Sequence, residues 1–119
     1  MTFQTELRHI LDRMEHAYNS GDAAACAALF TENAQLHSPF GPSASGRREI
    51  ETLHRDWVDD AGNKAFTVTG SGCDGALAWC LLRFSEGDAQ SEGTSLIVLE
   101  HHHDEGWLIR SCCLHGDPD

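Results

Sequence analysis

The amino-acid sequence predicts an α+β fold in which helices come first and an antiparallel sheet follows. Up to about residue 60, apolar residues recur at steps of three and four, which is the spacing of amphipathic helices. From Lys64 onward the pattern changes to β-rich runs separated by short turn sequences, which is typical of an antiparallel meander. We therefore expect the helices to pack on one face of the sheet.

The first helix is predicted from an apolar stripe, and the second from a run of small residues that follows it. One stripe runs over about residues 3–18, and Asn19-Ser20-Gly21 ends it. Asp22 is a suitable N-cap for a second helix, expected over residues 23–30. This second helix is short and rich in alanine, so it suits close packing against a neighbouring element.

The rest of the chain divides at its turn sequences. A short extended segment is expected at residues 34–38, followed by a loop. A third helix starts after Ser45-Gly46 and closes at residues 61–63. Its apolar face has the spacing i, i+3, i+4, i+7 and i+8, formed by Ile50, Leu53, His54, Trp57 and Val58. Four strands are then expected at residues 66–70, 76–84, 94–102 and 107–114.

Length and composition limit the classes of function. The 119 residues predict a single domain over residues 1–119 that needs no disulfides to bury a core. The net charge of −11 disfavours nucleic acid and anionic membrane surfaces as partners. No apolar run approaches the roughly 20 residues that span a bilayer, and the N-terminus lacks a signal-peptide pattern. The five cysteines are odd in number, which predicts reduced thiols and a cytoplasmic location.

Three stretches of the chain resemble the nuclear transport factor 2-like superfamily, which includes ketosteroid isomerases and SnoaL-like polyketide cyclases. They are YNSGDAAACAALFTENAQLHSPFG (18–41), SGRREIETLHRDW (45–57) and EGWLIRSCCLHG (105–116). The resemblance implies a cone-shaped, cystatin-like roll, in which a strongly bent antiparallel sheet wraps around three N-terminal helices. It also implies a deep, mostly apolar pocket for a small-molecule ligand, and it implies no cofactor.

The usual isomerase residues are missing from this sequence. By the resemblance, Ser38 stands where the isomerases have their general base, and Met14 where they have an oxyanion-hole Tyr. Leu99 falls near their protonated Asp. A serine has no accessible base pKa, and Met or Leu cannot donate a hydrogen bond to an enolate. We therefore do not expect steroid-type isomerisation by the family's usual residues.

Other polar residues take their place in the predicted pocket. The resemblance puts His54 where isomerases carry a pocket Tyr, and Tyr18 lies one helical turn beyond Met14. We expect His54 and Tyr18 to carry out proton transfer, assisted by His115 and Ser38, because an imidazole titrates near neutral pH.

The last strand contributes one of its two faces to this pocket. Strand alternation puts Ser111, Cys113 and His115 on one face and Arg110, Cys112 and Leu114 on the other. By resemblance, the face of Ser111 looks into the cone. The expected ligand contacts are Met14, Trp57, Val58, Leu99, Ser111 and Cys113.

Several alternatives remain open at this level. The same pocket could bind a metal ion such as zinc through His37, His54, Cys113 and His115. Cys113 could act as a nucleophile activated by a histidine. His54 could also simply line the pocket, in a non-catalytic binding or assembly module. Finally, the apolar strand residues Trp79, Phe84, Leu96 and Val98 predict an uncovered sheet face and a homodimer through it.

Overall fold

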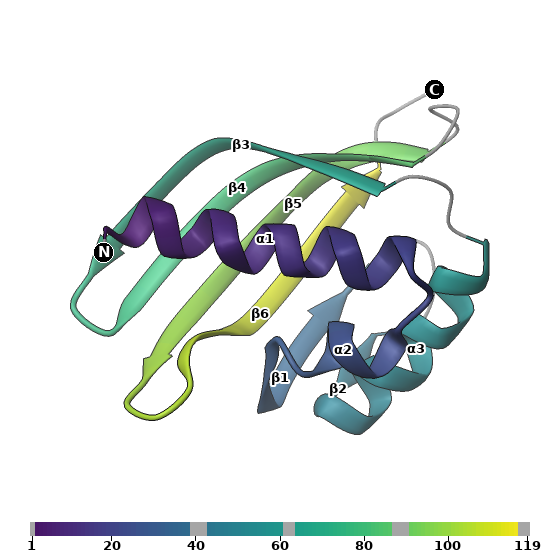
Figure 1. Cartoon of the computed structure of the whole chain (residues 1–119), viewed down its shortest axis with the longest axis horizontal. Coiled ribbons are helices and arrows are strands. Elements are labelled where there is room, and N and C mark those ends of the chain that lie inside the picture. Colours follow the sequence, from purple (N-terminus) through teal and green to yellow (C-terminus); the bar gives the residue numbers. More distant parts are fainter. Residues whose placement is uncertain (1, 39–42, 61–63, 87–90, 117–119) are drawn as a thin grey trace.

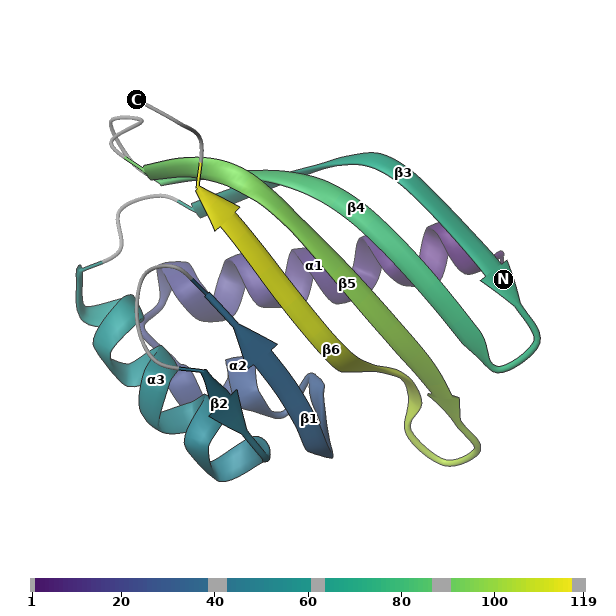
Figure 2. The same ribbon diagram turned by 180° about the vertical axis from the view of Figure 1, so that it is seen from behind.

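The helices all lie on one side of a curved six-stranded sheet (Figures 1 and 2). The computed structural model describes residues 2–38, 43–60, 64–86 and 91–116, and for residues 57–60, 64, 86 and 91 the backbone only. The helices are α1 (Phe3–Asn19), α2 (Ala23–Ala27) and α3 (Arg47–Asp60). The strands are β1 (Phe30–His37), β2 (Ala44–Ser45), β3 (Lys64–Asp74), β4 (Leu77–Glu86), β5 (Ser91–His102) and β6 (Gly106–Gly116).

The sheet confirms the predicted α+β class and adds one parallel pairing. Its strand order is β2-β1-β6-β5-β4-β3, and β3 to β6 form the predicted antiparallel meander. β1 joins this meander by running parallel to β6, which was not predicted. The sheet is therefore extended beyond β6 by a strand from the helical half of the chain.

The second helix is shorter than predicted, because its last residues belong to the sheet. α2 ends at Ala27, and β1 begins at Phe30, which pairs with Ile109 of β6. The Ile109 N–H donates to the Leu29 carbonyl at 2.8 Å. A five-residue helix has little stability of its own, so these sheet hydrogen bonds determine the conformation of residues 29 and 30.

The apolar stripe of α1 packs against the inner face of the sheet. The Thr2 hydroxyl caps the helix by accepting from the Thr5 N–H at 3.3 Å. The buried residues recur every three or four positions, as predicted, and are Leu7, Ile10, Leu11, Met14, Ala17 and Tyr18. Each fully buried Leu or Ile contributes about 1.5–3 kcal/mol, so the stripe fixes α1 across the sheet.

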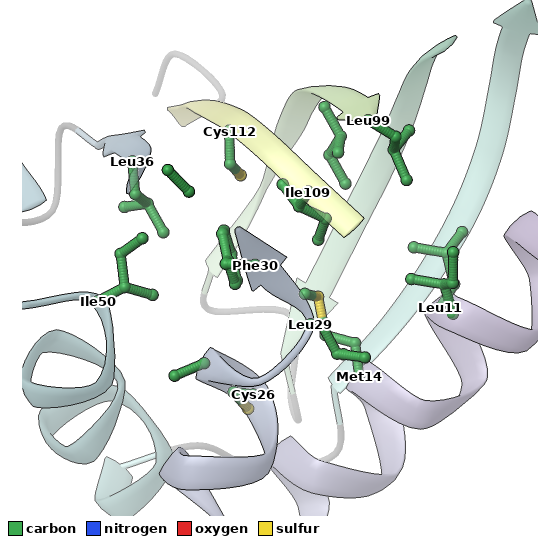
Figure 3. Packing of buried hydrophobic residues seen from close by; sticks show 14 of the residues in the cluster. Leu11, Met14, Cys26, Leu29, Phe30, Leu36, Ile50, Leu99, Ile109 and Cys112 are labelled. Carbon is green, nitrogen blue, oxygen red and sulfur yellow. The ribbon is translucent and has the colours of Figure 1, made fainter. Parts of the chain in front are cut away.

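A β-bulge in β6 reverses the predicted facing of its second half. Leu99 pairs with Ile109 and Val98 pairs with Ser111, so Arg110 is the extra residue. Before the bulge Ile109 points inward, and after it Cys112 does. Figure 3 shows both side chains on the same side of β6, in the core. The prediction that the face of Ser111 looks into the cone is therefore wrong.

The outer face of the sheet carries exposed apolar side chains, and none of the helices that the structure describes covers them. Its large exposed hydrophobic residues come from the adjacent strands β4 and β5 and are Leu77, Trp79, Leu81 and Leu96. We call these four residues the outer patch. Phe84 was predicted on this face, but alternation along β4 turns it inward, where it is buried.

Gly93 is needed where β5 passes between its two neighbouring strands. A Cβ at this position would overlap the carbonyl oxygen of His115 and lie 2.7 Å from the Phe84 ring. We predict that Gly93→Ala lowers the free energy of unfolding by about 1–3 kcal/mol, as expected for overpacking against backbone. Urea denaturation measures this change.

The exposed neighbour Glu92 gives the matched control. Glu92→Ala should change the free energy of unfolding by less than about 0.5 kcal/mol. Equal stability of the two variants would mean that the space around Gly93 does not constrain this residue.

Candidate functional site

A small cavity lies between the helices and the inner face of the sheet. Its walls are mostly apolar, and its four polar side chains are Tyr18, His54, Ser95 and Cys112. None of the lining residues that the structure describes is Asp, Glu, Lys or Arg. The volume is about 30 Å³, which is enough for one or two water molecules. Sites for drug-sized ligands measure about 300–1,000 Å³, so a ligand must move the walls apart to enter.

His54 is held in the cavity wall by the backbone of its own helix. Its side chain is 2% exposed, and Nδ1 lies 2.8 Å from the Ile50 carbonyl oxygen one turn earlier. A carbonyl oxygen only accepts hydrogen bonds, so Nδ1 is the protonated nitrogen of the ring. In the neutral imidazole, Nε2 then carries the lone pair. His54 therefore has a defined tautomer and orientation.

Two aromatic rings pack against His54. The Tyr18 ring lies edge-on at a centroid distance of 5.4 Å, and the Phe30 ring is tilted at 5.8 Å. Tyr18 is itself buried, and Met14, one turn earlier on α1, lines the same cavity. The structure thus brings together His54, Tyr18 and Met14, as expected from the stripes of the two helices.

The site residues predicted on the last strand lie outside the cavity. Beyond the bulge, Cys112 and Leu114 line the cavity, so Ser111, Cys113 and His115 face the other side of the sheet. There the Cys113 thiol lies 3.6 Å from Nε2 of His115. His115 is exposed and separated from His54 by the sheet.

The other residues predicted to line the pocket do not contribute to the cavity wall that the structure describes. Leu99 is fully buried but does not line the cavity. Ser38, directly after β1, is half-buried and is also absent from the cavity wall. Trp57 and Val58 lie in α3, but their side chains are outside the described residues.

The four predicted metal ligands do not form one site. His54 lies inside the cone, whereas His37 is exposed, pairs with Cys113 in the sheet and hydrogen-bonds to Ser43 at 3.1 Å. Within the described part of the chain, no three His, Cys, Asp or Glu side chains are arranged to hold a metal ion. The sheet divides the predicted set into inner and outer residues.

Sequence reasoning missed two polar residues of the cavity, Ser95 and Cys112. Ser95 is 4% exposed, and its hydroxyl oxygen lies 3.4 Å from the sulfur of Cys112. Ser95 alternates with Ile97 and Leu99 along β5, so its inward position could have been inferred. Cys112 could not, because nothing in the sequence marks the bulge.

Cys80 is a buried thiol of the core rather than of the cavity. Burial raises its pKa from the ordinary 9.0 to about 11, although the positive charge of Arg8 acts in the opposite direction. Because the thiolate is the reactive form of cysteine, this thiol is inert at neutral pH.

The fold and this interior cavity define the nuclear transport factor 2-like class of proteins. The model of the SnoaL-like domain matches residues 11–105, and the chain belongs to this family. A search of curated proteins finds no significant match. Across the described residues, no helix is sufficiently long and apolar to cross a membrane.

Solved structures with low sequence identity share the fold. A cystatin-like domain of unknown function from Nostoc punctiforme has a TM-score of 0.86 and 22% identity, covering 100% of this chain and 81% of that one. An NTF-2-like protein of unknown function from Shewanella oneidensis has a TM-score of 0.81 and 20% identity, over 95% and 98%. A ketosteroid isomerase-like protein from Erwinia carotovora atroseptica has a TM-score of 0.76 and 16% identity, over 94% of each chain. At these identities the likeness extends to the fold alone.

The raised pKa of Cys80 predicts a loss of stability in alkali. Between pH 9 and pH 11 the unfolded chain releases the thiol proton while the folded chain keeps it. Stability falls as pH rises through this range, by at most about 1.4 kcal/mol per pH unit from this group. We predict a shallower slope of the free energy of unfolding for Cys80→Ala, measured by urea denaturation at several pH values.

The exposed Cys73 gives the control for this measurement. Cys73→Ala should keep the slope of the wild type. If Cys80→Ala kept it as well, the Cys80 thiol would not contribute to the alkaline loss of stability.

Proposed function

We propose that this SnoaL-like protein binds a small apolar or aromatic molecule inside the cone, and that His54, beside Tyr18, transfers a proton on that ligand. The observation that carries this proposal is His54 itself, a buried imidazole with a fixed tautomer in an otherwise uncharged cavity wall. Packing alone does not require a histidine there, because an apolar residue would fill the same space.

The surroundings of His54 suit a general base. With Nδ1 donating to Ile50, proton uptake takes place at Nε2. The imidazolium formed in that step keeps its bond to the carbonyl, and the rings of Tyr18 and Phe30 lie within 6 Å of it. With a ligand in the cavity, the apolar walls keep bulk water away and strengthen these electrostatic interactions. His115 has no part in this scheme, because it lies across the sheet, and Ser38 does not line the cavity.

Ligand entry requires the cavity to widen. Met14 is the lining side chain with the most rotatable bonds, and an unbranched thioether adapts its shape at little cost. We infer that movement of Met14 is part of ligand binding.

The proposal predicts that His54 accelerates proton exchange on a carbon acid. We use cyclopentanone in D₂O and follow loss of its α-proton signal by NMR. His54→Asn keeps an N–H toward Ile50 but removes Nε2, so the rate should fall by about 10²-fold or more. The exposed His9 gives the control, and His9→Asn should exchange at the rate of the wild type.

Two results would count against proton transfer. Exchange by His54→Asn at the wild-type rate would exclude His54 as the base. Wild-type protein that binds cyclopentanone without accelerating exchange would favour a non-catalytic binding module.

The alternative function, a dimeric binding or assembly module, is favoured by the outer patch. Trp79 is 46% exposed although it is among the largest apolar side chains, and its neighbours in the patch are also exposed. Contiguous exposed apolar surface of this kind marks association sites. We infer that a second copy of this chain covers the patch, whether or not the cavity is catalytic.

A charge placed in the outer patch should separate the two copies. Leu96→Lys puts an ammonium group among apolar side chains, and we predict a monomer by light scattering coupled to size exclusion. Gln4→Lys adds the same charge on the exposed side of α1 and should leave the dimer intact. A monomeric wild type, or a dimeric Leu96→Lys variant with native circular dichroism, would contradict the inferred homodimer.

A further inference from the structure

Ser95 is a hydroxyl buried in the apolar sheet wall of the cavity. It lies on β5, 4% exposed, and its inward neighbours along the strand are Ile97 and Gly93. Its hydroxyl oxygen lies 3.4 Å from the sulfur of Cys112, which comes from β6. Burying a hydroxyl without a good hydrogen bond is unfavourable, and a thiol is a weak partner. An alanine would fill this position more favourably if packing were its only role.

The pairing with Cys112 leaves hydrogen-bonding capacity at Ser95. A hydroxyl has one donor and two acceptor sites, and one contact with a thiol uses one of them. When the Cys112 S–H donates to the Ser95 oxygen, the serine O–H is available to donate into the cavity. Cys112 then orients the hydroxyl, and both side chains line the same cavity as His54.

The charge of the cavity determines what this hydroxyl can bind. Among the described lining residues there is no Arg or Lys to neutralise an anion, and no carboxylate to neutralise a cation. Transfer of an unpaired ion from water into such a site is strongly unfavourable. A single neutral donor matches the oxygen of an uncharged molecule.

We propose that Ser95, oriented by Cys112, donates the hydrogen bond that holds the oxygen of an uncharged ligand, a ketone, an aldehyde or an alcohol. The inference rests on the proposed function, because it needs a ligand in the same cavity. It places the oxygen of the ligand at the sheet wall, while His54 acts from the helix wall. The ligand carbon next to that oxygen then lies between the two walls.

The test compares three probes built on the same five-membered ring by NMR titration, with the methyl signals of Ile97 and Leu82 as reporters of the cavity. The probes are cyclopentanone, its hydrocarbon analogue methylenecyclopentane, and cyclopentanecarboxylate. We expect Ser95→Ala to lower the preference of the wild type for the ketone over the hydrocarbon by roughly two- to tenfold, the value of one neutral hydrogen bond.

Matched variants separate ligand binding from structure. Thr31→Ala removes an equally buried hydroxyl that does not line the cavity, and it should keep the preference for the ketone. Ser95→Cys keeps the shape of the side chain with a weaker donor and should lower the preference. A purely structural role would weaken binding of ketone and hydrocarbon equally.

The outcomes distinguish this inference from the function on which it rests. The role of Ser95 would be overturned if Ser95→Ala kept the preference for the ketone, or if the wild type bound the carboxylate as tightly as the ketone. In either case the cavity would still be a ligand site. If none of the three probes perturbs the reporter signals, the cavity binds no such ligand and both proposals are contradicted.

Discussion

The parallel pairing of β1 with β6 is the interaction on which the rest of the structure depends. It joins a strand from the helical half of the chain to the last strand of the meander, with Phe30 opposite Ile109. The Phe30 carbonyl also accepts from the guanidinium of Arg47 in the first turn of α3, with Nε at 3.1 Å. One residue of β1 therefore positions both the sheet and the helix that carries His54. Without this pairing the cavity would lose the wall formed by α3.

Local patterns predicted the helices and the cavity residues on them. The stripes of α1 and α3 placed Met14, Tyr18 and His54 on the inner side, because helical periodicity is a property of the segment itself. Residues 29 and 30 were assigned to a helix for the opposite reason. Their conformation is determined by hydrogen bonds to β6, about eighty residues later in the chain. The local sequence pattern carries no information about such a distant partner.

The errors on the sheet have one cause, which is that side chains alternate between the two faces along a strand. A shift of one residue exchanges every side chain between the two faces. Along β5 the alternation is regular, so the inward Ser95 was open to inference. Along β6 the bulge at Arg110 moved Cys113 and His115 outward, and with them half of the predicted site. The predicted fold class did not depend on this facing, but the predicted set of site residues did.

The bulge at Arg110 also affects how this chain is compared with its relatives. In a relative without the extra residue, an alignment that has no gap at position 110 matches the inner residues on one side of the bulge with outer ones. Functional residues transferred along such an alignment would be assigned to the wrong side of the sheet. Residues of β6 in this chain are therefore matched with those of a SnoaL-like relative by their strand pairing, and not by counting residues from a shared motif.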